Sequence, residues 1–188
     1  MKKIIGLTGE PRAGKSSFIK ILTEIVKPLT IERISSGEIL TAIADAVGLQ
    51  KSRSNLQNLA IAIYDNLGKD VISYAVLAKM AKNYSDIIIF DGVRWESDVD
   101  MLRRFENSMI VYITADVRIR WQRARKAAEK ADEAVVSLDQ FEKEEQARTE
   151  LLIRKIGERA DFRITNNGTE NDLRKQVLDF YKQKLKGH

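Results

Sequence analysis

Short apolar runs alternate along the chain with longer stretches of helical periodicity. The apolar runs are typical of strands and cover residues 3–8, 31–35, 86–90, 108–114 and 161–165. Continuous apolar runs indicate strands covered on both faces, as in a parallel sheet. The helical stretches cover about residues 15–26, 37–48, 54–82 (as two helices), 96–105, 117–131, 137–159 and 169–185. This alternation predicts an α/β fold in three layers, with ligands at the carboxyl ends of the strands.

Length and composition fit one domain over residues 1–188, because no internal repeat or low-complexity linker divides the chain. No apolar segment is long enough to span a membrane, and the apolar start of the chain is too short for a signal peptide. We therefore expect a cytoplasmic protein without a membrane partner.

The residue types also limit the chemistry. The chain has no cysteine, and its one histidine is the last residue, His188. Disulfides, thiolate nucleophiles and cysteine zinc sites are excluded, so catalysis must use carboxylates, lysine, arginine, hydroxyls and a bound metal. The formal net charge of +5 suits an anionic ligand such as a polyphosphate. It also suits nucleic acid, or a mildly basic surface with no specific partner.

The strongest local signal is a glycine-rich loop between the first strand and the first helix. Residues 9–16 match the pattern G-x-x-x-x-G-K-[ST] in full. We expect the donor phosphates to be bound by the loop and by Ser17, that is by Gly9, Glu10, Pro11, Arg12, Ala13, Gly14, Lys15, Ser16 and Ser17. A turn that merely caps a helix would not require a lysine here. The loop therefore predicts binding of ATP, or a similar triphosphate, with Mg²⁺.

The loop residues have distinct expected roles. Backbone N–H groups and the helix N-terminus attract phosphate oxygens. Lys15 is expected to reach the β- and γ-phosphates, and the Ser16 hydroxyl to bind Mg²⁺. Arg12 adds a permanent cation inside the loop, where it can stabilise the charge that develops during phosphoryl transfer. The alternative for Arg12 is a solvated side chain that points outward.

Asp91 directly follows the apolar run at 87–90, so we expect it at the carboxyl end of a central strand. A carboxylate there can hold a Mg²⁺-bound water or accept a proton from an attacking hydroxyl. We therefore predict Asp91 as a catalytic residue and, with Ser16, as a metal ligand. The alternative is a turn-forming aspartate, because Asp-Gly pairs are common in turns.

The residues after Asp91 extend this candidate site. Arg94 could bind an acceptor phosphate or lie on a helix surface, and Trp95 could stack on an acceptor base. Glu38 and Glu10 are weak candidates for a catalytic base.

Three segments give the chain a family resemblance. They are Phe90-Asp91-Gly92-Val93-Arg94, the ending Ala160 to Gly168 followed by Leu173 to Val177, and Ser35 to Leu40. With the loop, they resemble the P-loop nucleoside monophosphate kinase-like group, above all dephospho-coenzyme A kinases and archaeal adenylate-kinase-related proteins. The resemblance covers nearly the whole chain.

The resemblance implies both an architecture and binding residues. It implies a five-stranded parallel sheet, a helical acceptor-binding region over about 36–83 and a mobile helical lid over about 116–150. It places Asn167 and Gly168 near the donor adenine, and Ser36, Gly37 and Glu38 against the acceptor.

Departures from the family leave the acceptor open. Adenylate kinases have an arginine where this chain has Thr41, and the spacing from Gly92 to Arg94 is one residue shorter. Arg53 is a candidate replacement that could bind an acceptor phosphate, although a surface position on a helix is the alternative. Dephospho-coenzyme A fits the C-terminal segment, whereas a nucleoside monophosphate fits Ser36 to Glu38.

The predicted lid is rich in arginine: Arg118, Arg120, Arg123, Arg125, Arg148 and Arg154. Most charges on such helices are solvated, so we expect one or two to act, chiefly Arg123 and then Arg148. The family's second lid arginine falls near Ala127. Arg12 could compensate, because some thymidylate kinases carry a catalytic arginine inside a similar loop.

The sequence therefore favours an ATP-dependent phosphotransferase that acts on a nucleotide-like small molecule. The alternatives are an ATP-binding regulatory protein without an acceptor, and a nucleic-acid-associated ATPase, for which the charge is the only indication. Nothing in the sequence indicates the oligomeric state.

Overall fold

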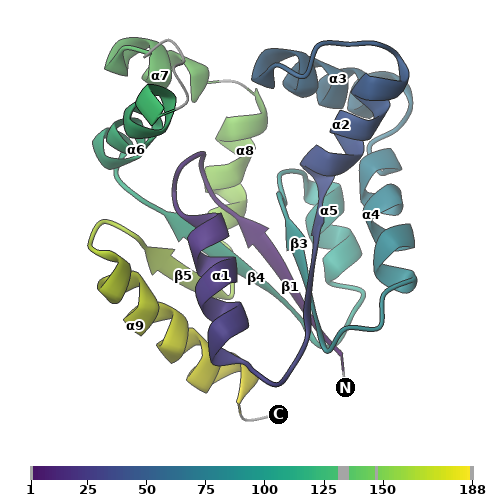
Figure 1. Cartoon of the computed structure of the whole chain (residues 1–188). Coiled ribbons are helices and arrows are strands. Elements are labelled where there is room, and N and C mark those ends of the chain that lie inside the picture. Colours follow the sequence, from purple (N-terminus) through teal and green to yellow (C-terminus); the bar gives the residue numbers. More distant parts are fainter. Residues whose placement is uncertain (1, 131–135, 147, 187–188) are drawn as a thin grey trace. The chain divides into compact units, whose positions relative to one another are not determined.

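A computed structural model describes residues 2–130, 136–146 and 148–186 (Figure 1). Its sheet has five strands in the order β2-β3-β1-β4-β5. They are β1 (Lys3–Thr8), β2 (Ile31–Ser35), β3 (Ile87–Asp91), β4 (Ser108–Thr114) and β5 (Phe162–Thr165). β3 pairs in parallel with β1 and β2, and β4 pairs in parallel with β5. The predicted α/β fold with a five-stranded parallel sheet is confirmed.

The described helices follow the predicted stretches closely. They are α1 (Lys15–Ile25), α2 (Ser36–Ala46), α3 (Arg53–Asn66), α4 (Val71–Ala81), α5 (Glu96–Leu102), α6 (Val117–Lys130), α7 (Leu138–Glu144), α8 (Arg148–Gly157) and α9 (Glu170–Phe180), with a π-helical turn at Tyr181–Leu185. The stretch 54–82 forms two helices, as predicted, and Gly68 between them has a φ of 130°. The stretch 137–159 also forms two helices. No described helix is long and apolar enough to cross a membrane.

The chain forms two compact units, and the first comprises residues 1–7 and 28–110. Its centre is β3, an isoleucine-rich strand that is buried along its whole length. The register pairs Asp91 with Leu7 of β1 and with Ser35 of β2. This pairing brings the carboxyl ends of β2 and β3 together, which is where a parallel sheet binds its ligands.

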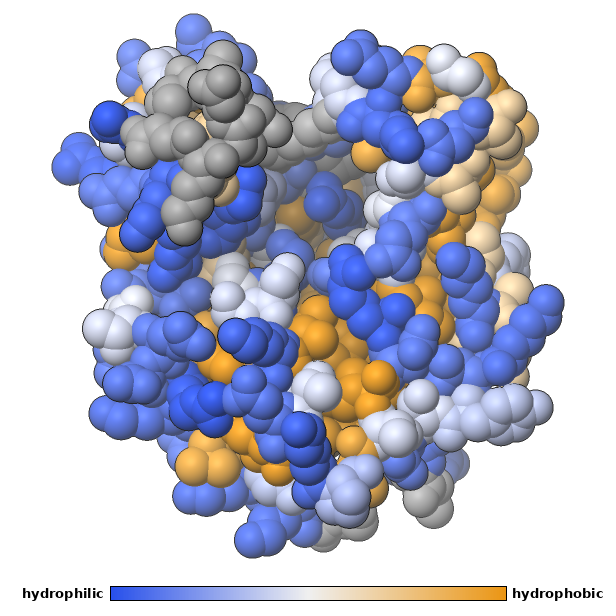
Figure 2. All heavy atoms as spheres, viewed as in Figure 1, coloured by the Kyte–Doolittle hydropathy of each residue, from blue (hydrophilic) through white to orange (hydrophobic). Residues whose placement is uncertain are grey.

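The helices of the first unit also expose apolar side chains. α2, α3 and α4 pack against one another. Apolar side chains gather along the right edge of Figure 2, where α3 and α4 lie. Leu67, Val71 and Tyr74 are among the exposed apolar residues of this region.

The second unit comprises residues 8–27 and 111–188. In this unit α1 packs against α9, and α9 packs against β5. Rings form the centre of this packing: the Phe180 ring centroid lies 5.5 Å from that of Phe18 and 5.2 Å from that of Phe162. The buried cluster anchors α1, whose N-terminus carries the glycine-rich loop.

Candidate phosphate-binding site

The glycine-rich loop joins the end of β1 to α1 and leaves the start of α1 open to a ligand. Gly14 is the N-cap residue of α1, in the left-handed conformation with a φ of 115°, and no side chain caps the helix. This φ disfavours any residue with a side chain, and a Cβ atom on Gly14 would also lie 2.2 Å from Nδ2 of Asn166. Because an uncapped helix start presents free N–H groups and the positive end of the helix dipole, it suits an anion.

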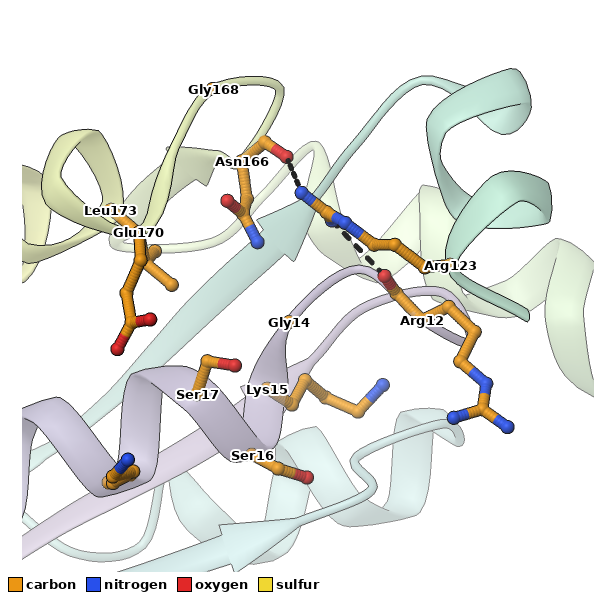
Figure 3. A pocket seen from close by; sticks show the side chains of 11 residues that line it. Arg12, Gly14, Lys15, Ser16, Ser17, Arg123, Asn166, Gly168, Glu170 and Leu173 are labelled. Atoms are coloured by element: carbon orange, nitrogen blue, oxygen red, sulfur yellow. Dashed lines mark hydrogen bonds between the residues drawn. The ribbon is translucent and has the colours of Figure 1, made fainter. Parts of the chain in front are cut away.

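A cavity of about 630 Å³ lies over this helix start. Its lining comprises Arg12, Gly14, Lys15, Ser16, Ser17, Lys20, Arg123, Asn166, Gly168, Glu170 and Leu173. In Figure 3, Arg12, Lys15 and Ser16 extend to one side of the picture, and Glu170 and Leu173 lie on the other. The cavity therefore has a cationic end beside the loop and an end formed by α9. Lys20, Glu170 and Leu173 were missed from the sequence, because nothing local marks which face of α1 or α9 borders a ligand.

Lys15 lies within the loop. Its Nζ donates to the carbonyl oxygens of Gly9, at 2.6 Å, and Glu10, at 3.2 Å. These bonds hold the ammonium group beside the helix start, where a phosphate would meet it. Ser16 is exposed in the same cavity, as a metal ligand would be.

Arg12 adopts an unusual backbone conformation. Its φ is 62°, and no other described residue except glycine has a positive φ. This conformation costs about 1 kcal/mol for a residue with a side chain. Strain of this kind clusters at functional sites, and the exposed guanidinium group lines the cavity.

Asn166, and not Asn167, contacts the loop. The buried Nδ2 of Asn166 donates to the carbonyl oxygen of Ala13 at 2.8 Å. Asn167 instead accepts a bond from the N–H of Asp116 through Oδ1, at 2.8 Å, and stabilises the turn before α6. The sequence prediction missed Asn166. Strand alternation was the available signal, because Asn166 follows the fully buried Ile164 by two residues.

Arg123 connects α6 to the loop. Its Nη2 donates to the carbonyl oxygen of Asn166 at 2.8 Å, and its Nη1 to the carbonyls of Arg12 and Ala13 at 3.3 and 3.4 Å (Figure 3). Burial lowers the pKa of this guanidinium group. The geometry makes Arg123 a clamp on the loop backbone, and its catalytic role stays a prediction.

A second arginine of α6, Arg120, is structural. It is buried and forms a paired contact with the Glu145 carboxylate, and its Nε donates to the carbonyl of Ala115 at 2.7 Å. Burial is the main cause of its lowered pKa. Arg154 of α8 donates to the same carboxylate at 3.1 Å and lies 3.9 Å from Glu10. Arg148 begins α8, but its side chain lies outside the described residues.

Glu10 turns its carboxylate away from the loop. The side chain is buried, and its Oε1 accepts a hydrogen bond of 2.5 Å from the Tyr112 hydroxyl on β4. The backbone carbonyl of Glu10, in contrast, accepts a bond from Lys15. Glu10 therefore serves the loop through its backbone, while its carboxylate ties the loop to β4. Burial and this hydrogen bond raise the pKa of Tyr112 to about 12.

We expect Tyr112 to stay protonated at pH values where ordinary tyrosines ionise. Its folded pKa of about 12 lies above the unfolded value of about 10. The stability it contributes is therefore present below pH 10 and is lost as the pH rises through 12. Absorbance titration at 295 nm should give the same phenolate signal near pH 10.5 for the wild type and Tyr112→Phe. A wild-type excess of one phenolate at that pH would contradict the expectation.

The predicted acceptor residues lie in the first unit and centre on an ion pair that the sequence did not reveal. Nε of Arg33 lies 2.8 Å from Oδ2 of Asp91, and its Nη1 lies 2.5 Å from Oε1 of Glu38. The pKa of Arg33 is raised: burial alone lowers it, but Asp91 and then Glu38 outweigh the burial. Strand pairing was needed to find Arg33, because 58 positions separate it from Asp91.

Ser36 and Gly37 also lie at this edge. The Ser36 hydroxyl donates to the carbonyl of Gly92 at 3.3 Å. Gly92 has a φ of 107°, and a Cβ atom there would lie 2.7 Å from the Ser36 hydroxyl. The N–H of Gly37 donates to the Ser35 hydroxyl, which caps α2. The segment is therefore closely packed against the turn after β3.

Three further residues of this region were candidates for acceptor binding: Trp95, Arg94 and Arg53. Trp95 is buried and stacks on Tyr64, with ring centroids 4.1 Å apart, so the idea that it stacks on an acceptor base is wrong. The backbone N–H of Arg94 donates to buried Asp98 at 3.0 Å. Arg53 begins α3, as predicted, and its side chain lies outside the described residues. Its role stays a prediction.

The metal site also stays a prediction. Within the described ranges, no three His, Cys, Asp or Glu side chains gather to hold a metal ion. The two proposed ligands belong to different units, Ser16 to the second and Asp91 to the first. The open helix start and Lys15 suit the phosphates of a triphosphate, and the Ser16 hydroxyl could bind a metal that arrives with it.

This fold and loop define a P-loop kinase-like protein. The chain belongs to the family described as an AAA domain, whose model matches residues 8–142. A curated relative is the UPF0200 protein of the archaeon Methanosarcina barkeri. It is 26% identical over 179 residues, which cover 94% of this chain and 93% of the relative.

Solved structures of the same fold include two kinases. Shikimate kinase from Aquifex aeolicus has a TM-score of 0.54 and 15% identity, over 98% of this chain and 99% of that structure. Dephospho-CoA kinase from Campylobacter jejuni also has a TM-score of 0.54, with 18% identity over 100% of this chain and 99% of that structure. At such identities the similarity shows the fold alone. The predicted resemblance to P-loop kinases is confirmed.

Proposed function

We propose that the protein is an ATP-dependent phosphotransferase that moves the γ-phosphate of ATP to a nucleotide-like small molecule in the cytoplasm. The observation that carries this proposal is the uncapped start of α1, with Lys15 and Ser16 beside it and a cationic cavity above it. The kinase-like fold and the order of the predicted acceptor and lid segments along the chain add support. The related structures are named as kinases that act on shikimate and dephospho-CoA.

Catalysis in this proposal is positioning and electrostatic stabilisation. The loop N–H groups and Lys15 bind the donor phosphates, and Arg12 neutralises charge on the group that moves. When bound with the donor, Mg²⁺ neutralises phosphate charge, with Ser16 and Asp91 as its proposed ligands. Arg123 holds the loop and Asn166 in register from α6.

The acceptor candidates are dephospho-coenzyme A and a nucleoside monophosphate. The test is ADP release from Mg²⁺-ATP, with and without each compound of an acceptor panel. We expect one acceptor to raise the rate by about tenfold or more over basal hydrolysis, because acceptor binding completes the site. Turnover that no small molecule changes, but that DNA or RNA accelerates, would contradict the proposal and favour the nucleic-acid-associated ATPase. Tight ATP binding without acceptor-dependent turnover would favour the regulatory alternative.

We expect Arg12→Gly to lower acceptor-dependent turnover by about 10²-fold, since the variant loses a cation beside the transferred group. Glycine is the matched replacement, because it accepts the φ of 62° without strain. The variant should therefore unfold at a temperature no lower than the wild type. Turnover within about threefold of the wild type, together with loss of activity in Arg123→Ala, would show that Arg123 and not Arg12 does this work.

A further inference from the structure

The charged groups at the carboxyl ends of β2 and β3 bear on the chemistry of the acceptor. Arg33 precedes Ser35 by two residues on β2, so both side chains lie on the same face of the strand. The register pairs Ser35 with Asp91 of β3. Arg33 can therefore reach across to Asp91 while it also contacts Glu38 in the first turn of α2. These three side chains form the acceptor-edge cluster.

The cluster carries a net negative charge. One guanidinium group is shared by two carboxylates, so the three side chains sum to −1. A Mg²⁺ ion that arrives with ATP would leave this balance negative, because the donor phosphates already neutralise its charge. The Asp91 side chain is 9% exposed and that of Arg33 is 41% exposed, whereas Glu38 is 53% exposed. Among the described side chains of the acceptor-edge cluster, carboxylates therefore outnumber cations.

We infer that the group which accepts the phosphoryl is an alcohol oxygen and not a phosphate oxygen. This inference rests on the proposed phosphotransferase activity. A phosphate acceptor brings about two negative charges at neutral pH and needs cations that are free to pair with it. At this edge, such an acceptor would have to displace Glu38 from Arg33 and would still face Asp91.

Thr41 itself supplies no cation to this edge. It stands where adenylate kinases carry an arginine, and its hydroxyl donates to the carbonyl of Gly37 in its own helix at 2.8 Å. An alcohol, in contrast, requires no cation. Its O–H donates a hydrogen bond, and carboxylates are acceptors with several free lone pairs. The cluster is therefore built to bind hydroxyl groups.

The transfer step is balanced without any further reactant. The alcohol oxygen forms a bond to the γ-phosphorus, and the bond from that phosphorus to the bridging oxygen of ADP breaks with its electron pair. The hydroxyl proton is released to water. Arg33 acts in this step as a positioning residue, because it holds Asp91 and Glu38 through separate arms of its guanidinium group.

The first test compares two classes of acceptor in the ADP-release assay. The alcohols are dephospho-coenzyme A, nucleosides, shikimate and simple sugars, and the phosphates are the nucleoside monophosphates. We expect an alcohol to stimulate turnover and the monophosphates to leave it at the basal rate. Stimulation by a monophosphate with a nucleoside diphosphate as product would overturn the inference and keep the proposed function. No stimulation by either class would overturn both.

The second test changes the charge of the cluster. In the wild type, we expect AMP not to compete with the alcohol acceptor. In Glu38→Gln, one arm of Arg33 is released and the net charge becomes zero, so AMP should inhibit competitively and raise the apparent KM of the alcohol by about fivefold. Glu32→Gln is the control. It removes one negative charge at an exposed position of β2, next to Arg33 in the sequence but outside the cluster. Equal AMP inhibition in the wild type and Glu38→Gln would overturn the inference.

The positioning role of Arg33 has its own readout. Arg33→Met should lower kcat with the alcohol acceptor by about tenfold while leaving the KM for ATP unchanged, and Arg33→Lys should recover part of that loss. If Arg33 were purely structural, Arg33→Met would lower kcat, raise the KM for ATP to a similar extent and lower the melting temperature. That result would contradict the assignment of Arg33.

Discussion

Replacing Lys15 by alanine is expected to lower kcat/KM for ATP by about 10³-fold, the loss typical of a charged group that acts on the transferred phosphoryl. The ammonium group lies 2.6 Å from the Gly9 carbonyl and lines the cavity over the start of α1. Its removal takes away the cation that both binds the donor and stabilises the transition state. The fold should persist, because Lys15 is only half-buried and its ammonium group donates to backbone carbonyls of its own loop.

Lys27→Ala is the matched control for this experiment. It removes the same charge from an exposed position just after α1. Acceptor-dependent ADP release and equilibrium binding of a fluorescent ATP analogue should be measured for both variants. If Lys15→Ala retained turnover within about threefold of Lys27→Ala, the loop would not be the site of phosphoryl transfer.

The second large effect is on stability. Gly9→Ala should lower the free energy of unfolding by about 4 kcal/mol, as for other substitutions that force backbone to move. A Cβ atom at Gly9 would lie 2.1 Å from the carbonyl oxygen of Ile113 on β4, and the φ of 153° already disfavours a side chain. The backbone of a strand inside a sheet cannot move aside as the end of a flexible side chain can.

Gly48→Ala provides the comparison. Gly48 also has a positive φ, of 69°, but a Cβ atom there would meet nothing within 4 Å. We expect that variant to lose only about 1 kcal/mol, from the left-handed backbone alone. Urea unfolding of both variants separates backbone strain from the steric contact. Equal losses would contradict the close approach of Gly9 to β4.

The sequence predicted the elements because their signals are local. The bounds of β1, β2 and β4 agree with the apolar runs, since isoleucine-rich segments between turn residues leave little alternative to a buried strand. β3 and β5 each begin one residue later than predicted, and Asp91 is the last residue of β3 and not the first one after it. The glycine-rich loop was predictable because its residues are contiguous and their chemistry needs that order.

The site was less predictable wherever a contact joins distant segments. Arg33 could not be assigned before β2 was paired with β3, and Asn166 was hidden by its neighbour Asn167. Burial also changed expectations that rested on residue type. Trp95 packs on Tyr64 and is not available to stack on an acceptor base. Arg120 was expected among the solvated charges of the lid, but it is buried against Glu145. Charged and aromatic residues indicate chemistry only after burial has been determined.

The charges of the acceptor-edge cluster bear on which kind of acceptor can bind. The kinase-like fold is shared by proteins whose acceptors differ, so it does not decide among them. The net charge of Arg33, Asp91 and Glu38, by contrast, bears directly on whether a dianion or an alcohol binds beside them. Electrostatics at this edge therefore bears on the choice between dephospho-coenzyme A, which would offer an alcohol, and a nucleoside monophosphate, which would offer a phosphate.

Transfer of phosphate from ATP to a small molecule at this site can be followed with a radioactive label. The most direct measurement incubates the protein with ATP labelled at the γ-phosphate and with the acceptor that stimulates ADP release, and then separates the products. We expect label on the acceptor in equal amount to the ADP formed, and no labelled acceptor with Lys15→Ala. Label that appears only as inorganic phosphate, at the same rate with and without acceptor, would contradict this expectation.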